Sequence, residues 1–64
     1  MDRLLLPEEV ADRVRRPKTT LAFWRTRGLG PKSARVQGRV MYRESDVEAW
    51  IAEQFIAAGG HDAA

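Results

Sequence analysis

Apolar residues near the start of the chain recur at helical spacing, which predicts a short helix over residues 7–14. Two valines and an alanine fall on one face of this segment, at i, i+1 and i+4 spacing. The segment begins with a proline, which suits the first helical position because its missing N–H would be unpaired there in any case. We expect Leu5 or Leu6 to pack beneath the apolar face.

A second helix is predicted from about residue 17 to residue 27. A proline again marks the start, and Gly28 after two arginines marks the end. Leu21 and Trp24 are three residues apart and should face inward. Only residues 15–17 separate the two helices, so the pair should form a tight helix-turn-helix.

A β-hairpin is predicted next, from strands at 34–36 and 39–42 joined by Gln37 and Gly38. Their β-branched and aromatic content, with a two-residue link containing glycine, is typical of a hairpin. Such short strands are not stable alone and must pack on the helices. Alternation places Arg35 and Arg39 on the surface and Val36 and Val40 inward.

A third helix is predicted from Ser45 to about residue 58. Ser45 and Glu48 have the spacing of a capping box, with the serine as the N-cap. An apolar stripe follows at i, i+3, i+4 and i+8, and it should face the core. The stripe consists of Val47, Trp50, Ile51 and Phe55.

These elements predict a mostly α-helical fold with one small β-hairpin. The order is helix-turn-helix, two-stranded wing and C-terminal helix, which is that of a winged helix-turn-helix. Residues 1–58 should form one domain, and residues 59–64 a flexible tail.

The distribution of charged residues along the chain is more informative than the overall composition. Between residues 13 and 43, a stretch called the basic block below, the chain has ten basic residues and no acid. All nine acids lie outside it, so a +10 centre and −8 flanks sum to the net charge of +2. Such segregation predicts a positive surface whose self-repulsion a polyanion would relieve. A solvated basic segment with no ligand is the alternative.

The second helix is the candidate for reading base edges, because an α-helix fits the major groove of DNA. We expect Lys18, Thr19, Ala22 and Phe23 to enter the groove. Lysine can donate to guanine acceptors, and phenylalanine or alanine can contact a thymine methyl group. Phe23 could instead pack against the hairpin, and Thr19 and Thr20 could simply cap the helix.

Basic residues of the hairpin would lie along the phosphate backbone or enter the minor groove, where they add affinity and register. The complete set of predicted DNA contacts is Arg16, Lys18, Thr19, Ala22, Phe23, Arg25, Thr26, Lys32, Arg35, Gln37, Arg39 and Arg43.

Other classes of function have little support. There are no cysteines, and the single histidine, His61, has no partner histidine. No catalytic triad, metal-ligand spacing or phosphate-binding glycine loop is present, so we expect no enzyme, no metal and no cofactor. No apolar run approaches the roughly 20 residues of a membrane span. We expect a soluble bacterial protein of the cytoplasm, associated with the nucleoid.

Three segments together resemble a known family: residues 17–25, residues 28–32 and residues 38–51, read with the Pro-Glu-Glu-Val-Ala run at 7–11. The chain resembles the MerR-type winged-helix excisionases and AlpA-like regulators of phages and integrated elements, over roughly residues 5–56. The family usually has glycine, an apolar residue and serine where this chain has Arg15, Arg16 and Pro17. Ala22 stands where a longer polar residue is frequent.

The resemblance implies that the second helix enters the major groove and that the hairpin acts as the wing. It also implies a role as a recombination directionality factor, which binds repeated sites in an attachment region, bends the DNA and directs an integrase toward excision. The implied partners are double-stranded DNA, an integrase and further copies of the chain on DNA. Two alternatives remain, a transcriptional regulator and a protein-interaction module that uses the stripe of the third helix as a groove.

Overall fold

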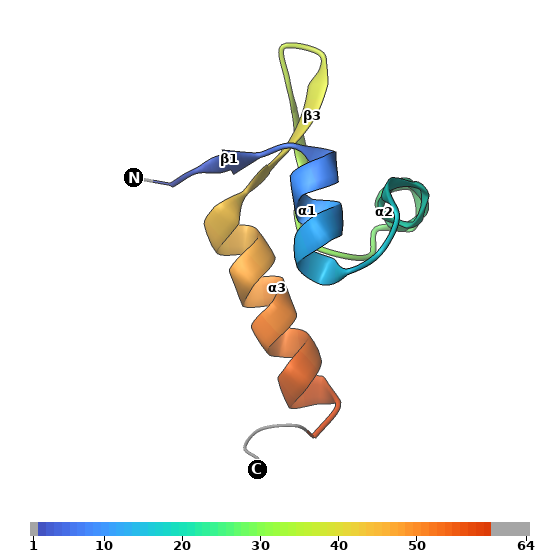
Figure 1. The fold of residues 1–64 in the computed structure, drawn as a ribbon, viewed down its shortest axis with the longest axis vertical. Coiled ribbons are helices and arrows are strands. Elements are labelled where there is room, and N and C mark those ends of the chain that lie inside the picture. Colours follow the sequence, from blue (N-terminus) through green and yellow to red (C-terminus); the bar gives the residue numbers. More distant parts are fainter. Residues whose placement is uncertain (1, 60–64) are drawn as a thin grey trace.

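The computed structural model describes residues 2–59, so the predicted tail, with His61, lies outside the described residues except for Gly59. Figure 1 shows the arrangement, with a β-hairpin projecting at one end of the molecule and the last helix at the other. The elements are β1 (Leu4–Leu5), α1 (Pro7–Val14), α2 (Lys18–Arg27), β2 (Ala34–Val36), β3 (Arg39–Arg43) and α3 (Glu44–Ala57). We call the β2–β3 hairpin the wing. The predicted winged helix-turn-helix order is confirmed.

The turn between α1 and α2 is as tight as the sequence indicates. Glu9 accepts a hydrogen bond from the Leu6 N–H at 2.7 Å, which satisfies one donor at the start of α1. The helix ends at Arg15, which has a left-handed backbone with φ of 59°. Pro17 is the N-cap of α2 rather than its first residue, and no side chain caps this helix. The threonine cap considered above is therefore wrong.

The sheet has one strand more than the sequence analysis predicted. The strand β1 pairs antiparallel with β3, with Leu5 opposite Tyr42, and the strand order is β1-β3-β2. A two-residue strand is too short to show an alternating pattern, so periodicity could not reveal it. Its pairing brings Leu5 into the core, where this residue is 1% exposed.

The start of α3 differs from the predicted capping box. The helix begins at Glu44, with Arg43 as the N-cap and no capping bond from that residue's side chain. Asp2 supplies the acceptors instead, because its carboxylate takes hydrogen bonds from the Ser45 N–H at 3.1 Å and from the Ser45 hydroxyl at 2.7 Å. Glu48 turns toward α1 and binds Arg13 at 2.8 Å. The capping-box prediction is therefore wrong, because the carboxylate of Asp2, and not the Ser45 hydroxyl, accepts the hydrogen bond from an N–H at the start of the helix.

One buried side chain from each of five elements forms the core. These side chains are Leu5, Val10, Leu21, Tyr42 and Val47, and all of them are at most 1% exposed. Trp24, Val40 and Ile51 pack around them, as predicted.

Two residues predicted to face inward do not. Val36 is 40% exposed, because strand pairing places it opposite Arg39 on the outer face of the wing. Phe55 is 63% exposed, since α3 continues past the point where α1 can cover it.

Candidate nucleic-acid interface

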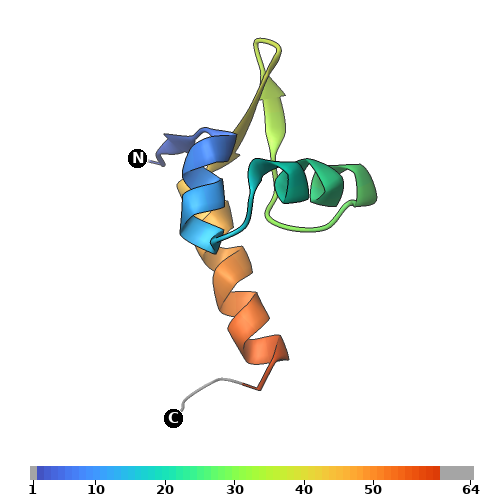
Figure 2. The ribbon, with the colours of Figure 1, turned by 45° about the vertical axis from the view of Figure 1, so that its right-hand side comes forward.

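The outward face of α2 carries the side chains predicted to read base edges. Lys18, Thr19, Ala22, Phe23 and Thr26 are all exposed, whereas Leu21 on the inward face is fully buried. Figure 2 shows α2 extending away from α1 and α3, with the wing rising beside it. A helix held out from the body in this way presents the shape that enters a major groove.

Phe23 lies on the solvent side of α2 and does not pack against the wing. It is 52% exposed, and the Arg27 guanidinium stacks over its ring with the carbon 4.8 Å from the centroid. This cation–π contact joins residues one helical turn apart. The sequence analysis did not include Arg27 among the DNA contacts, although its i, i+4 spacing from Phe23 was a visible signal.

The N-terminus of α2 has the electrostatics of an anion site. Its first turn contains Lys18 and no acid, so no residue of that turn offsets the positive end of the helix dipole. Unpaired N–H groups and a lysine at a helix start favour phosphate.

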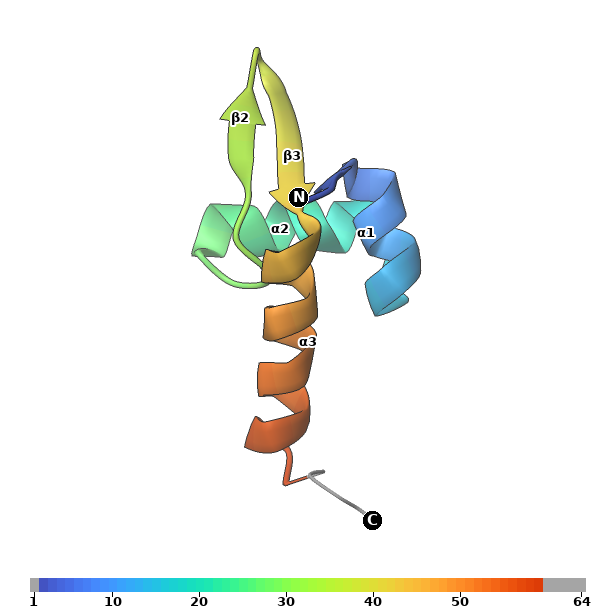
Figure 3. The ribbon, with the colours of Figure 1, turned by 90° about the vertical axis from the view of Figure 1, so that its left-hand side faces the viewer.

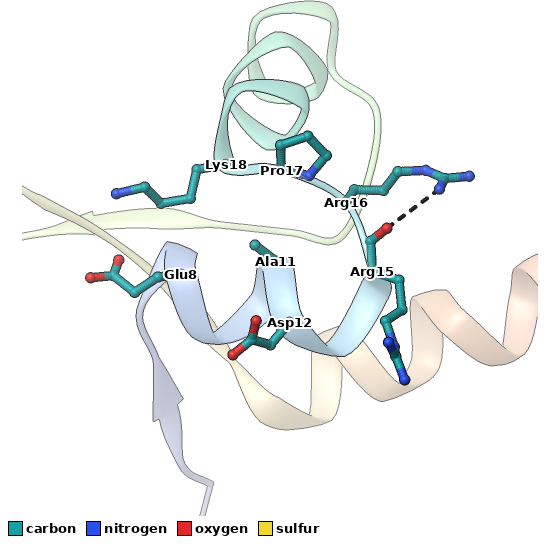
Figure 4. Close-up of a pocket in the computed structure, with 7 residues that line it drawn as sticks. All are labelled: Glu8, Ala11, Asp12, Arg15, Arg16, Pro17 and Lys18. Carbon is teal, nitrogen blue, oxygen red and sulfur yellow. Dashed lines mark hydrogen bonds between the residues drawn. The ribbon is translucent and has the colours of Figure 1, made fainter.

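A hollow of about 620 Å³ lies beside this helix start, at the junction with α1 (Figure 4). Glu8 and Asp12 border it from α1, and Arg16 and Lys18 border it from the turn and α2. An anion in this hollow would meet two carboxylates as well as the cations. The outward face of α2 is therefore the better surface for phosphate.

The two predicted wing arginines are exposed but lie on opposite faces of the wing. Arg35 pairs with Val40, and Arg39 pairs with Val36. Because paired residues of an antiparallel ladder share a face, Arg35 lies on the face that includes half-buried Val40, and Arg39 lies on the outer face. Arg35 also donates to the Gly38 carbonyl at 3.1 Å, which holds its side chain along the hairpin tip.

A second hollow, of about 450 Å³, separates α2 from the wing. Ala22, Arg25 and Thr26 line it from α2, and Arg35 and Ser33 line it from the hairpin side. Figure 3 shows α2 crossing behind the base of the wing. Arg35 and the Ser33 hydroxyl can donate to a phosphate of the DNA backbone here, whereas the Thr26 hydroxyl already donates to the Ala22 carbonyl at 3.1 Å.

Arg25 is half-buried and is occupied within the fold. Its guanidinium donates to the Tyr42 hydroxyl at 2.8 Å, which ties α2 to β3. This bond links the last turn of the helix to the strand β3 of the wing.

Two further arginines of the basic block form ion pairs. Arg13 binds Glu44 at 2.7 Å and Glu48 at 2.8 Å, and these carboxylates raise the pKa of the Arg13 guanidinium. Arg43 binds Asp46 at 2.9 Å, and that hydrogen bond likewise raises the pKa of Arg43. The acid at residue 46 thus partly neutralises one of the predicted DNA contacts.

The other seven basic residues of the block are exposed and have no acid within 4.0 Å among residues 2–59. This free cationic set is Arg15, Arg16, Lys18, Arg27, Lys32, Arg35 and Arg39. It runs from the helix-turn-helix junction along α2 to the wing. The predicted contact Gln37 lies at the wing tip, where it is exposed and has a left-handed backbone with φ of 55°.

Other kinds of site find no support in the described part of the chain. Within residues 2–59 no three histidine, aspartate or glutamate side chains gather as a metal site requires. No helix in that range is long and apolar enough to cross a membrane.

A helix-turn-helix followed by a wing, with free cations on the second helix and on the hairpin, defines a class of DNA-binding domain. A family model described as helix-turn-helix domain matches residues 4–55. The chain belongs to this family, which supports sequence-specific DNA binding and is typically non-enzymatic. A search of curated proteins and a search of solved structures each found no match.

Proposed function

We propose that the chain binds double-stranded DNA with α2 in the major groove and the wing on the adjacent backbone, without catalytic chemistry of its own. The observation that carries this proposal is the free cationic set, which follows α2 and the wing and has no acid within 4.0 Å among residues 2–59. Lys18 and Thr19 would contact base edges, and Phe23 and Ala22 would contact thymine methyl groups. Thr26, on the same face of α2, would also contact DNA in the major groove.

The wing would supply affinity rather than sequence choice. Arg35 would hold a phosphate in the hollow beside α2, and Arg39, with Lys32 and Gln37, would contact the backbone from the outer face. Arg16 would contact a phosphate at the helix start. Arg43 would contribute only after it leaves Asp46, and Arg25 chiefly positions the wing.

In the cell we propose that the protein acts in the bacterial cytoplasm as an excisionase of a phage or integrated element. It would bind repeated sites in an attachment region, associate with further copies there, bend the DNA and direct an integrase toward excision. The resemblance of residues 17–51 to excisionases supports this role, and Ala22, where a longer polar residue is frequent in that family, suits binding that depends partly on DNA shape. Control of transcription at a promoter is the second candidate, because the same resemblance includes AlpA-like regulators.

DNA binding is tested by fluorescence anisotropy with duplexes of random and attachment-site sequence, over a range of salt concentrations. Affinity should fall steeply with salt, because each phosphate contact adds about 0.9 to the slope of log K against log salt. Arg39→Ala should reduce that slope by about 0.9, the value of one phosphate contact, and should lower the affinity for all DNA sequences alike. Lys18→Ala should also relax the preference for the specific site.

The matched control is Arg3→Ala, which removes one exposed arginine from outside the basic block. It should change affinity by less than about twofold, since a distant exposed charge acts only through a screened field. No binding at low salt, or equal losses for Arg3→Ala and Arg39→Ala, would overturn the proposal. Excision and promoter-reporter assays with the same variants would then separate the two cellular roles.

A further inference from the structure

The second half of α3 extends beyond the rest of the domain and carries uncovered apolar side chains. Residues 52–57 are all exposed, including Phe55 at 63% and Ile56 at 69%. Figures 1 and 2 show this half of the helix running past the end of α1. Only the first half is anchored, through Val47 and Ile51.

A groove of about 530 Å³ lies where α3 passes the end of α1 and the inner side of α2. Its floor is apolar and comes from three helices, with Val14, Trp24, Trp50, Ile51 and Phe55. The two indole rings lie 5.2 Å apart between centroids and tilt by 45°, so they form a continuous aromatic surface. Both tryptophans are only half-buried, so this surface is open to solvent.

The edge of the groove is positive. Arg13, Arg15 and Arg16 line it, and only Arg13 is neutralised by acids of α3. In Figure 4 the Arg15 side chain points from the turn toward α3. Glu53 is two residues from both Ile51 and Phe55 and therefore lies on another side of the helix.

We propose that this groove binds an amphipathic helix of a partner protein, with acidic residues beside the apolar face of that helix. An apolar floor built from three helices suits the apolar anchors of a helix at i, i+3, i+4 and i+7, and the tryptophans offer the aromatic contacts that dominate such interfaces. Carboxylates on the partner would pair with Arg15 and Arg16.

A second copy of this chain fits the groove less well. A two-fold contact through this groove would bury Arg15 and Arg16 of both copies in an interface whose lining includes no carboxylate, so these charges would lack partners. Nucleic acid is also a poor occupant, because its phosphates would gain nothing from the apolar floor. The apolar floor of the groove contains none of the proposed DNA contacts, and Arg16 on its edge is the one residue that the two proposals share.

The test uses a designed helical peptide of about four turns, with leucines at the anchor positions, glutamates beside them and no aromatic residue. Trp24 and Trp50 are the only tryptophans of the chain, so their fluorescence reports directly on the groove. The expected result is a saturable blue shift with micromolar affinity. A peptide with lysine in place of glutamate should bind at least about tenfold more weakly.

Two substitutions on α3 provide the matched comparison. Phe55→Asp should lower the affinity for the glutamate peptide at least about tenfold. Ile56→Asp should leave that affinity within about twofold, because the Ile56 side chain leaves the helix about 100° away from that of Phe55. Both side chains are exposed, so both variants should keep the wild-type circular dichroism and DNA affinity. Arg15→Glu should remove most of the preference for the glutamate peptide, because it leaves the edge formed by residues 15 and 16 without net charge.

Equal binding of the two peptides, or equal loss in the two α3 variants, would overturn the proposal. A dimer seen by sedimentation without peptide and removed by Phe55→Asp would assign the groove to a second copy and would also overturn it. Absence of DNA binding by the wild-type chain, with intact peptide binding, would refute only the proposed DNA function.

Discussion

Replacing Gly30 by alanine should destabilise the domain much more than the same change at Gly28. Both glycines have a left-handed backbone, with φ of 79° and 70° respectively. That conformation costs an L-residue about 1–2 kcal/mol, so each substitution carries this penalty. The difference between them lies in what the new methyl group meets.

At Gly30 a Cβ atom would lie 2.8 Å from Trp24 Cε3 and 3.3 Å from Trp24 Cβ. The same indole also contacts Trp50, with ring centroids 5.2 Å apart, so relief requires the loop or this pair of rings to move. Forcing extra volume into a packed site costs about 1–3 kcal/mol, which makes the Gly30→Ala total about 2–5 kcal/mol. A Cβ at Gly28 would have nothing within 4 Å, so only the conformational penalty applies.

Thermal and urea unfolding, followed by circular dichroism, measure the difference. A domain of this size has a net stability of roughly 3–10 kcal/mol, and 1 kcal/mol shifts its Tm by about 4–8 °C. Gly30→Ala should therefore lower the Tm by more than about 10 °C, and Gly28→Ala by about half as much or less. Equal Tm shifts in the two variants would show that the Trp24 side chain does not pack against Gly30, and the packing argument would fail.

Further substitutions test the helix ends and the contact between α2 and the wing. Arg15→Gly should raise the free energy of unfolding in urea by about 0.5–1 kcal/mol, because glycine accepts the left-handed backbone at small entropic cost; a decrease would contradict the strain assigned there. The pKa of Asp2 lies below its ordinary value because the Ser45 hydroxyl and N–H donate to its carboxylate. Its contribution to stability is therefore complete above the unfolded pKa of about 3.9 and is lost as pH falls through the lowered folded pKa. Asp2→Asn should reduce the free energy of unfolding at neutral pH and should reduce its fall at acid pH. An unchanged fall at acid pH would exclude Asp2 as its source. Tyr42→Phe should cost about 1 kcal/mol through the lost bond from Arg25 and should weaken DNA binding by loosening the wing, which anisotropy in parallel with unfolding would detect.

The sequence predicted the elements whose signals are local. Helix spacing, proline starts and glycine stops are decided within a few residues, and so the predicted α1, α2 and wing agree with the structure within one or two residues. The outward face of α2 was likewise predictable, because Leu21 and Trp24 define the inward face by helical geometry alone.

Features that depend on pairing between distant segments were not predictable in this way. Leu4 and Leu5 become a strand only because β3 is available as a partner. Ser45 loses its expected role as the N-cap because Asp2 reaches it from the other end of the chain.

The sequence alone therefore determined the order of the elements, the inward and outward faces of α2 and the separation of basic from acidic residues along the chain. Only the tertiary structure decided which charges are free, since Arg13, Arg25 and Arg43 find partners that are remote from them or on another element. It also decided that α3 extends past the end of α1 and that Phe55 is exposed. The physical reason is that helix faces follow from bonds between near neighbours, whereas charge neutralisation and burial depend on contacts that exist only once the chain has folded.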